Sequence, residues 1–413
     1  AANGIKAYIF PSLRPTPMLS FALRELGCTA GVVVTASHNP PQYNGYKVYW
    51  EDGAQITAPK DKQIITEVQA ITDFAQVKTM SEEDAKAAGL YEVIGEEIDD
   101  RYMEALKNLV LRPEAIKEQA DKLKIVYTPL HGTGNIPVRR VLKELGFNNV
   151  YVVKEQELPD GDFPTVSYPN PEDKNAFTLA LKLAAEVDAD IVLATDPDAD
   201  RLGIYAKNEK TGEYESFTGN MSGMLILEYL LSQRKELGML PENGAVVTTI
   251  VSGKMARVIA KEYNVALIET LTGFKYIGEQ IKFFEQNHDY EFLFGYEESY
   301  GCLEGTHARD KDAVVAVMAL CEAAAYYKSK GITLCEQMEK LYQKYGFYKE
   351  SLFFQTFPGA EGKAKIDGLM DALRNQPPKQ VGPFKVTALE DYKKSVRTCL
   401  LYTSPSPRDL STS

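Results

Sequence analysis

The strongest constraint in this sequence is the alternation of short β-rich runs with amphipathic helical runs. In the middle of the chain, KIVYTP (124–129) precedes IPVRRVLKELG (136–146), and NVYVV is followed by NAFTLALKLAAEV and ADIVLATDP. The same order returns later, in GAVVTTIV, GKMARVIAKEY, VALIETL and EFLFGYEE. Such alternation is typical of α/β layers built on a mixed, largely parallel sheet. We therefore predict an α/β fold.

The alternating pattern recurs in three successive stretches of similar plan. The first begins with helical PTPMLSFALRELG and strand-like TAGVVVTAS, and in each stretch a loop marked by Gly or Pro follows a strand. We predict three α/β domains over residues 1–120, 121–240 and 241–398. The polar helical stretch 96–120 is expected to link the first two domains.

The end of the chain breaks the pattern. The run CLLYTSPSPRDLSTS (399–413) has no periodicity and no face that could join a core. Residues 399–409 match, in one reading frame, the translation of a common transposase-based sequencing adapter. We therefore interpret 399–413 as a non-native tail and expect the natural protein to continue beyond Arg397.

The charge balance excludes some classes of function. The chain has 46 Lys and Arg against 58 Asp and Glu, a formal net charge of −12, so a nucleic-acid partner is not expected. No apolar run approaches the roughly 20 residues of a membrane helix, so a membrane partner is not expected either. The five cysteines are few and widely spaced, which favours a reduced, cytoplasmic protein.

An acidic loop follows the strand-like run ADIVLAT. It holds Asp196, Asp198 and Asp200 at alternate positions. Carboxylates this close repel one another unless a cation lies between them, and their hard oxygens suit Mg²⁺ or Ca²⁺. A calcium EF-hand is excluded because its sixth and twelfth positions hold Arg201 and Lys207 instead of Gly and Glu. We predict a site for Mg²⁺ or Ca²⁺, with Arg201 as a cation suited to a neighbouring phosphate; the alternative is a solvated acidic turn.

A serine and a histidine stand side by side after another apolar run, in GVVVTASHNPP, which we expect to be a buried strand. Serine alone is a weak nucleophile and needs a neighbouring base, for which His38 and Lys47 are the candidates. A phosphate on Ser37 would supply a further oxygen ligand to the predicted metal. The alternative is a polar turn in which His38 only shapes the loop.

The combination of TASHNP and DPDADR, in this order and at this separation, resembles the α-D-phosphohexomutase superfamily of phosphoglucomutases, phosphomannomutases and their relatives. The later GYEESYG (295–301) resembles the family's sugar-recognition loop, which implies that Glu297 and Ser299 bind sugar hydroxyls. Tyr296 and Tyr300 replace the usual glycines there. This favours the phosphoglucomutase/phosphopentomutase branch, which TGFKYIG (272–278) and HARDKDA (307–313) also match.

The resemblance further implies a four-domain enzyme with one loop of each domain in a central cleft. Three domains are expected here, without the fourth domain and without the first strand of domain one. By the same likeness Lys311 is a catalytic or phosphate-contacting lysine, and Gly273 and Lys275 contact the substrate. We expect little activity from a chain that lacks the fourth domain.

The implied reaction is reversible transfer of phosphate between O1 and O6 of glucose through phospho-Ser37. Mg²⁺ would be held by the phosphoserine and the three aspartates, and glucose 1,6-bisphosphate would be the intermediate. A monomer or homodimer is expected. The alternatives are a phosphopentomutase, a phosphomannomutase, a Mg²⁺-dependent phosphatase and a non-catalytic sugar-phosphate-binding protein.

Overall fold

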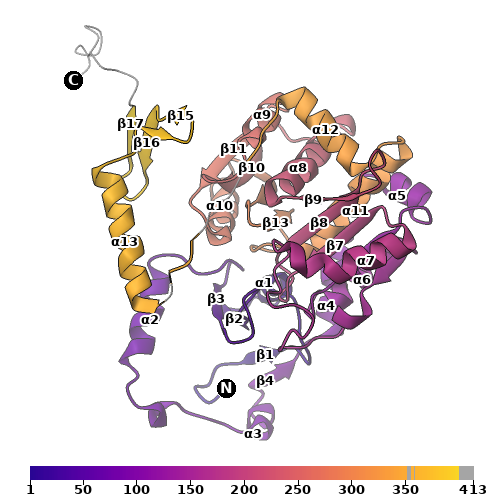
Figure 1. Ribbon diagram of the computed structural model, residues 1–413. Helices are drawn as coiled ribbons and strands as arrows, with labels where there is room; N and C mark the ends of the chain where they lie inside the picture. Colours follow the sequence, from indigo (N-terminus) through magenta and orange to yellow (C-terminus); the bar gives the residue numbers. More distant parts are fainter. Residues whose placement is uncertain (351–354, 358, 400–413) are drawn as a thin grey trace. The chain divides into compact units, whose positions relative to one another are not determined.

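The computed structural model describes residues 1–350, 355–357 and 359–399. The chain divides into two compact units, Ala1–Tyr348 and Lys349–Ser413 (Figure 1). The stretch 241–398, predicted as the third domain, is therefore divided between both units. Of the predicted non-native tail, all but Cys399 lies outside the described residues.

A five-stranded sheet with the order β6-β5-β7-β8-β9 forms the middle of the first unit. Its first three strands are parallel, and β8 and β9 run antiparallel to their neighbours. The strands are β5 (Ile125–Thr128), β6 (Val150–Val152), β7 (Ile191–Thr195), β8 (Leu202–Lys207) and β9 (Tyr214–Phe217).

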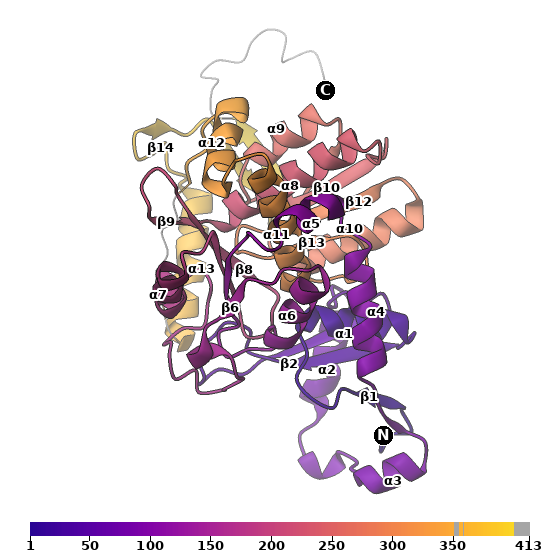
Figure 2. The same cartoon turned by 90° about the vertical axis from the view of Figure 1, so that its right-hand side faces the viewer.

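Helices cover both faces of this sheet, α6 (Asn135–Glu144) on one side and α7 (Thr178–Val187) on the other (Figure 2). Successive side chains of β5 therefore enter different cores. Val126 packs in the cluster of α7, whereas Ile125 and Tyr127 pack in the larger cluster that includes α6. All five residues of β7 are buried, as expected for a strand covered on both faces.

A second sheet has the order β11-β10-β12-β13, with three parallel strands and an antiparallel β13. Its strands are β10 (Gly244–Thr249), β11 (Ala266–Thr270), β12 (Glu291–Tyr296) and β13 (Cys302–Glu304). The accompanying helices are α8 (Gly219–Glu236), α9 (Met255–Glu262), α10 (Phe274–Asn287), α11 (Ala313–Ser329) and α12 (Leu334–Tyr345). The two larger sheets confirm the predicted mixed, largely parallel α/β architecture.

Helix α11 is apolar on almost every side, and nearly all of its residues are buried, including Glu322, which accepts hydrogen bonds from Leu111 and Tyr229. It packs against α5, α6, α8 and β13, and so joins the cores of the two large sheets. Its first turn is capped by the carboxylate of Asp312, which accepts hydrogen bonds from the backbone of Val314 and Val315.

The N-terminal part is built differently, from two small sheets. Strand β1 (Ala7–Ile9) pairs in parallel with β4 (Tyr91–Val93), and β2 (Ala30–Val34) pairs antiparallel with β3 (Tyr46–Trp50). Its helices are α1 (Thr16–Glu25), α2 (Lys60–Ala70), α3 (Glu82–Ala87), α4 (Glu96–Lys107) and α5 (Pro113–Gln119). Helices α4 and α5 occupy the stretch predicted to link the first two domains.

The second unit contains a helix and two hairpins. These are α13 (Gly359–Asn375), β14 (Gln380–Val381) with β15 (Phe384–Lys385), and β16 (Ala388–Asp391) with β17 (Val396–Cys399). Throughout the described part of the chain, no helix combines the length and apolar character needed to span a bilayer.

Candidate active site

The first component of the site is the loop after β2. Ser37 has a positive φ of 53°, and its backbone N–H donates to Oγ1 of Thr35 at 2.8 Å. The chain returns to β3 past Gly45, where a Cβ would lie 1.9 Å from the carbonyl oxygen of Thr35, so a side chain does not fit. A non-glycine residue in this region of φ is strained, and such strain concentrates at functional sites.

The second component is the acidic loop between the antiparallel strands β7 and β8. Asp196, Asp198 and Asp200 are all buried, and each offers a carboxylate oxygen within 4.8 Å of the others. The loop folds back on itself because Oδ1 of Asp196 accepts the backbone N–H groups of Asp200 and Arg201. On its other oxygen, Asp196 accepts a hydrogen bond from Ser37 Oγ at 3.1 Å. The predicted nucleophile and the predicted metal loop therefore meet.

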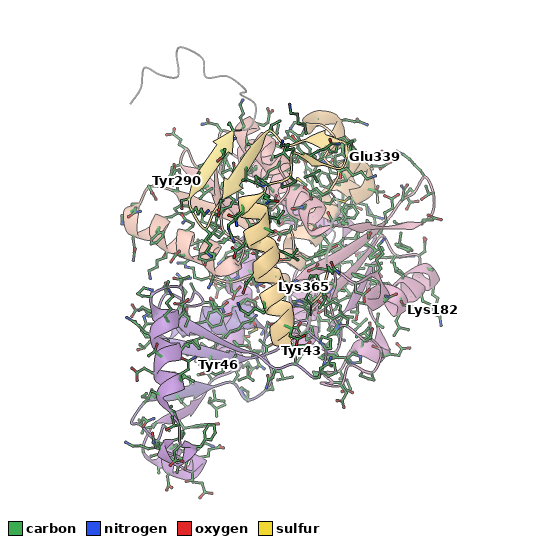
Figure 3. All side chains as sticks on the ribbon, turned by 60° about the vertical axis from the view of Figure 1, so that its left-hand side comes forward. Tyr43, Tyr46, Lys182, Tyr290, Glu339 and Lys365 are labelled. Carbon is green, nitrogen blue, oxygen red and sulfur yellow. The ribbon has the colours of Figure 1, made fainter. Side chains whose placement is uncertain are left out.

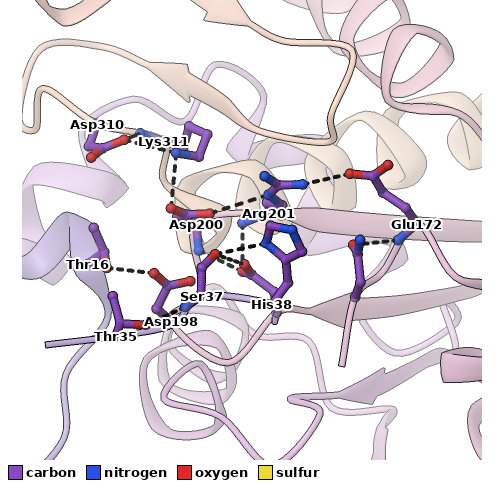
Figure 4. A network of polar contacts seen from close by, with 12 residues as sticks. Thr16, Thr35, Ser37, His38, Glu172, Asp198, Asp200, Arg201, Asp310 and Lys311 are labelled. Carbon is purple, nitrogen blue, oxygen red and sulfur yellow. Dashed lines mark hydrogen bonds and ion pairs between the residues drawn. The ribbon is translucent and has the colours of Figure 1, made fainter. Parts of the chain in front are cut away.

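Two lysines from different parts of the chain contact Asp200 (Figure 4 shows Lys311). Nζ of Lys47, on β3, lies 2.9 Å from Oδ2 of Asp198 and 3.1 Å from Oδ2 of Asp200. Nζ of Lys311, in the loop before α11, lies 3.0 Å from that same oxygen of Asp200. Burial opposes a charged Lys47, but Asp200 and Asp198 raise its pKa well above the usual value. Both lysines are thus held as ammonium groups.

The carboxylates respond in opposite directions to their surroundings. Burial would raise the pKa of Asp200, but Lys311 and Lys47 hold it well below its ordinary value. Burial does raise the pKa of Asp196, and the neighbouring Asp198 and Asp200 raise it further. Close carboxylates with divergent pKa values are common at functional sites.

The acidic loop also fits a hard divalent cation. Among the described residues, Oδ1 of Asp198 and Oδ1 of Asp200 are buried and have no hydrogen-bond partner. A buried acceptor without a donor costs roughly 1–3 kcal/mol. A cation bound to carboxylate oxygens removes that penalty, and Mg²⁺ and Ca²⁺ prefer such ligands.

His38 contacts the nucleophile directly. Its Nδ1 lies 3.1 Å from Ser37 Oγ, and its ring meets the Tyr168 ring edge-on, with centroids 5.9 Å apart. Burial, followed by the charge of Arg201, lowers the pKa of His38 to about 4. The imidazole is therefore neutral near pH 7 and can accept a proton.

Arg201 is oriented by a carboxylate outside the acidic loop. Its NH1 lies 2.6 Å from Oε1 of Glu172, while its Nε is 3.9 Å from Oδ1 of Asp200. The guanidinium group therefore lies beside the aspartates, where an anionic group next to the metal loop would need a cation.

The predicted sugar loop follows β12. Oε1 of Glu297 accepts the backbone N–H of Gly273 at 2.8 Å, and burial raises the pKa of this carboxyl group. Gly273 has a φ of 121°, a conformation open to glycine, and it directly precedes α10, whose first turn contains Lys275. Ser299 is half-buried in the same loop as Glu297.

This loop also supports Lys311. The backbone of Gly301, two residues beyond Ser299, lies so close to the lysine that a Cβ there would be 2.0 Å from its Cδ. The sugar loop and the metal loop are therefore connected through the side chain of Lys311. The structure thus brings most of the predicted residues into two adjoining clusters; their individual roles stay predictions.

Comparisons with known proteins agree with this geometry. Models of phosphoglucomutase/phosphomannomutase α/β/α domains I, II and III match residues 1–74, 100–211 and 218–345. A phosphoglucomutase of Staphylococcus epidermidis is 39% identical over 402 residues, which cover 97% of this chain and 71% of that protein. The chain belongs to the phosphoglucomutase/phosphomannomutase family.

Other members of the family are similar over comparable lengths. A Staphylococcus aureus phosphoglucomutase is 37% identical over 395 residues, covering 96% of this chain and 69% of that protein. The crystal structure of a putative phosphomannomutase from Thermus thermophilus superposes with a TM-score of 0.66 at 26% identity, covering 84% of this chain and 70% of that one. The predicted superfamily and fold are thereby confirmed.

Several residues that contact the site were not predicted from the sequence. Thr16 donates through Oγ1 to Oδ2 of Asp198 at 3.1 Å, and its backbone N–H donates to the carbonyl of the same residue at 3.0 Å. Glu172 orients Arg201, and Asp310 contacts both Lys311 and Tyr49. Asp310 lies within HARDKDA, so its position beside Lys311 was a usable signal. Nothing in the local sequence marks Thr16 or Tyr49.

Proposed function

We propose that this chain carries the catalytic residues of a phosphoglucomutase, which transfers phosphate reversibly between O1 and O6 of glucose through phospho-Ser37. The observation that carries the proposal is the 3.1 Å contact of Ser37 Oγ with a buried aspartate of the metal loop. The family relationship supports a mutase more than a phosphatase or a binding protein. Glucose is favoured over mannose because the 39% and 37% identical relatives are phosphoglucomutases.

The cofactor we propose is Mg²⁺, held by Asp196, Asp198, Asp200 and an oxygen of phospho-Ser37. When bound, a divalent cation neutralises charge on the phosphate that is being transferred. The chain's own residues complete the electrostatic environment: Arg201, Lys47 and Lys311 surround the carboxylates with positive charge. Preorganised charge of this kind is commonly the largest contribution to catalysis.

The proposed reaction begins with glucose 1-phosphate and phospho-Ser37. The bond from phosphorus to Ser37 Oγ breaks, a bond to O6 of the sugar forms, and the proton of the O6 hydroxyl passes to a base. We propose His38 as the acceptor because its Nδ1 lies 3.1 Å from Ser37 Oγ, at the position of the transferred phosphate, and because its imidazole is neutral whereas Lys47 is held as an ammonium. Its lowered pKa makes it a weak base, which returns the proton readily in the second transfer.

The resulting glucose 1,6-bisphosphate must turn over in the site before the second transfer. The phosphate on O1 then passes back to Ser37 Oγ, and O1 becomes the phosphate-free hydroxyl by taking up the proton. Glu297 and Ser299 are proposed to hold sugar hydroxyls in both orientations, and Gly273 and Lys275 to contact the substrate. Glu297 is already oriented by its hydrogen bond from Gly273.

The cellular setting is part of the same proposal. All five cysteines are unpaired, three of them buried, which is consistent with a reducing cytoplasm. A monomer or a homodimer is proposed on the family likeness.

A phosphoenzyme assay tests the proposal. The chain is incubated with Mg²⁺ and glucose 1,6-bisphosphate, and intact-mass spectrometry with peptide mapping locates any added phosphate. We expect one phosphate on Ser37, none in Ser37→Ala, and glucose 1-phosphate among the products. Unmodified wild-type protein, or phosphate on another residue, would contradict the phosphoserine assignment. Mannose 1,6-bisphosphate and ribose 1,5-bisphosphate run in parallel identify the preferred sugar.

A further inference from the structure

Asp310 is a buried carboxylate that reaches into the site without belonging to the acidic loop. It is 3% exposed. Its Oδ2 accepts the hydroxyl of Tyr49 at 2.5 Å, and its Oδ1 accepts both the backbone N–H of Lys311 at 2.8 Å and Nζ of Lys311 at 3.2 Å. The carboxylate therefore binds both ends of the Lys311 residue.

Tyr49 connects Asp310 to the strand that carries Lys47. The tyrosine is fully buried, and it lies two positions after Lys47 on β3, so both side chains point to the same face of the strand. Asp310 thus links the loop before α11 to β3 through hydrogen bonds at both of its carboxylate oxygens. Figure 4 shows Asp310 beside Lys311 and Lys311 above Asp200.

The ammonium of Lys311 in turn fixes one oxygen of Asp200. Oδ2 of Asp200 contacts Nζ of both Lys311 and Lys47, while its Oδ1 is the buried oxygen that has no hydrogen-bond partner among the described residues. A carboxylate held through one oxygen presents the other in a defined direction. Asp198 is held in the same way: its Oδ2 contacts Lys47 and Thr16, and its Oδ1 is buried and has no hydrogen-bond partner among the described residues.

We propose that Asp310 is a positioning residue for the cation site. It holds the Lys311 ammonium against Oδ2 of Asp200, and so directs Oδ1 of Asp200 toward a divalent cation. This inference rests on the proposed metal site. Within the described part of the chain, the Asp310 side chain bonds to Tyr49 and Lys311 and to no residue of the acidic loop. Groups that hydrogen-bond to the partners of a metal ion orient them in this way in many proteins.

A simpler explanation has to be separated from this one. Asp310 carries a negative charge near the site, and its loss would weaken cation binding through space even if it positioned nothing. The two explanations differ in whether the effect of Asp310 requires Lys311. A double-mutant cycle measures that dependence.

The probe is Mn²⁺, titrated into the purified full chain and followed by electron paramagnetic resonance of the free ion. We expect Asp310→Asn to weaken Mn²⁺ binding about three- to tenfold, the size of the effect of losing one ordinary hydrogen bond. In a Lys311→Met background the same substitution is expected to change the Kd by less than about twofold. Asp190→Asn is the matched control, because it removes a lysine-paired aspartate at the opposite end of β7.

An equal loss in both backgrounds overturns the proposal in favour of through-space charge. Should Asp310→Asn fail to fold, Tyr49→Phe replaces it in the cycle, because it removes only the hydroxyl that donates to Oδ2 of Asp310. A loss of Mn²⁺ affinity of about twofold that occurs with Lys311 present, and not in the Lys311→Met background, supports the proposal. No Mn²⁺ binding by the wild-type chain would refute the metal site and this inference with it. Normal binding with an additive cycle refutes the inference alone.

Discussion

The strands that carry the two halves of the site differ sharply in how they are supported. Asp196 follows β7, a central strand of five fully buried residues between β5 and β8. Ser37 follows β2, which belongs to a two-stranded sheet and whose alternate residues are exposed. Val34 is 68% exposed, and its partner on β3, Tyr46, is exposed to the same extent. Figure 3 labels Tyr46 on this strand.

This difference indicates which half determines the geometry. The acidic loop is fixed by a two-sided core and by hydrogen bonds within the loop. Ser37 is placed by local contacts with Thr35 and His38 and by one long-range hydrogen bond to Asp196 of the acidic loop. We conclude that the acidic loop after β7 is the rigid part of the site, and that the loop carrying Ser37 is positioned against it. Substitutions in β7 should therefore affect stability and the site more than substitutions in β2.

The largest loss of stability is expected from a cavity beside β7, the strand that precedes the acidic loop. Leu193, on β7, is completely buried, and Leu→Ala at such positions costs about 2–5 kcal/mol of the free energy of unfolding. We expect Leu193→Ala to lose that much in urea denaturation and also to weaken Mn²⁺ binding, because β7 positions Asp196. Unchanged stability would show that the packing of β7 does not support the acidic loop.

The next effect concerns the acidic loop itself. Asp198→Asn removes one of the three carboxylates and leaves Lys47 with Asp200 alone. A hard cation with few protein ligands cannot easily replace one, so we expect the Kd for Mg²⁺ to rise at least about tenfold, or ~1.4 kcal/mol. Calorimetry measures this, with the exposed Asp162→Asn as control. Equal affinity in Asp198→Asn and wild type would exclude Asp198 as a ligand.

The contrast between β7 and β2 also marks the limit of sequence-based prediction. Alternation predicted the α/β layers, and two short motifs located Ser37 and the aspartates, because strand periodicity and loop chemistry are local properties. Thr16, Tyr49 and Glu172 were missed, since each reaches the site only through tertiary contacts that local sequence does not encode. The exposed outer face of β2 was missed as well, because an apolar run such as GVVVT is equally consistent with burial on both sides.

A pH effect tests the burial of a carboxyl group directly, because burial raises its pKa. Burial raises the pKa of Glu304, on β13, to about 8 despite the nearby Arg234. The folded state therefore holds this proton more tightly than the unfolded state, whose value is near 4.5. The resulting stability is fully present below about pH 4.5 and is lost as pH rises through 8, by up to ~1.4 kcal/mol per pH unit.

The test compares Glu304→Gln with wild type by urea denaturation at several pH values between 5 and 8. The variant stays neutral, so its stability relative to wild type is expected to improve steadily with rising pH. Glu92→Gln is the control, because Glu92 on β4 is exposed. This substitution should change the free energy of unfolding by the same amount at pH 5 and at pH 8. A constant difference for Glu304→Gln would mean that this carboxyl group is already ionised in the folded protein at pH 5.

The smallest effect is expected on the outer face of β2. Val34 is three residues before Ser37, yet its side chain is 68% exposed, so truncation leaves no cavity and removes little buried apolar area. Val34→Ala should change the free energy of unfolding by less than about 0.5 kcal/mol, as exposed substitutions usually do. It should also leave phosphorylation of Ser37 unchanged, because the serine is held by Thr35, His38 and Asp196 and not by the outer face of its strand. Urea denaturation and the phosphoenzyme assay measure the two quantities on one preparation. A loss comparable with that of Leu193→Ala would mean that this face is covered in solution, and the nucleophile loop would then have a second support as firm as the metal loop.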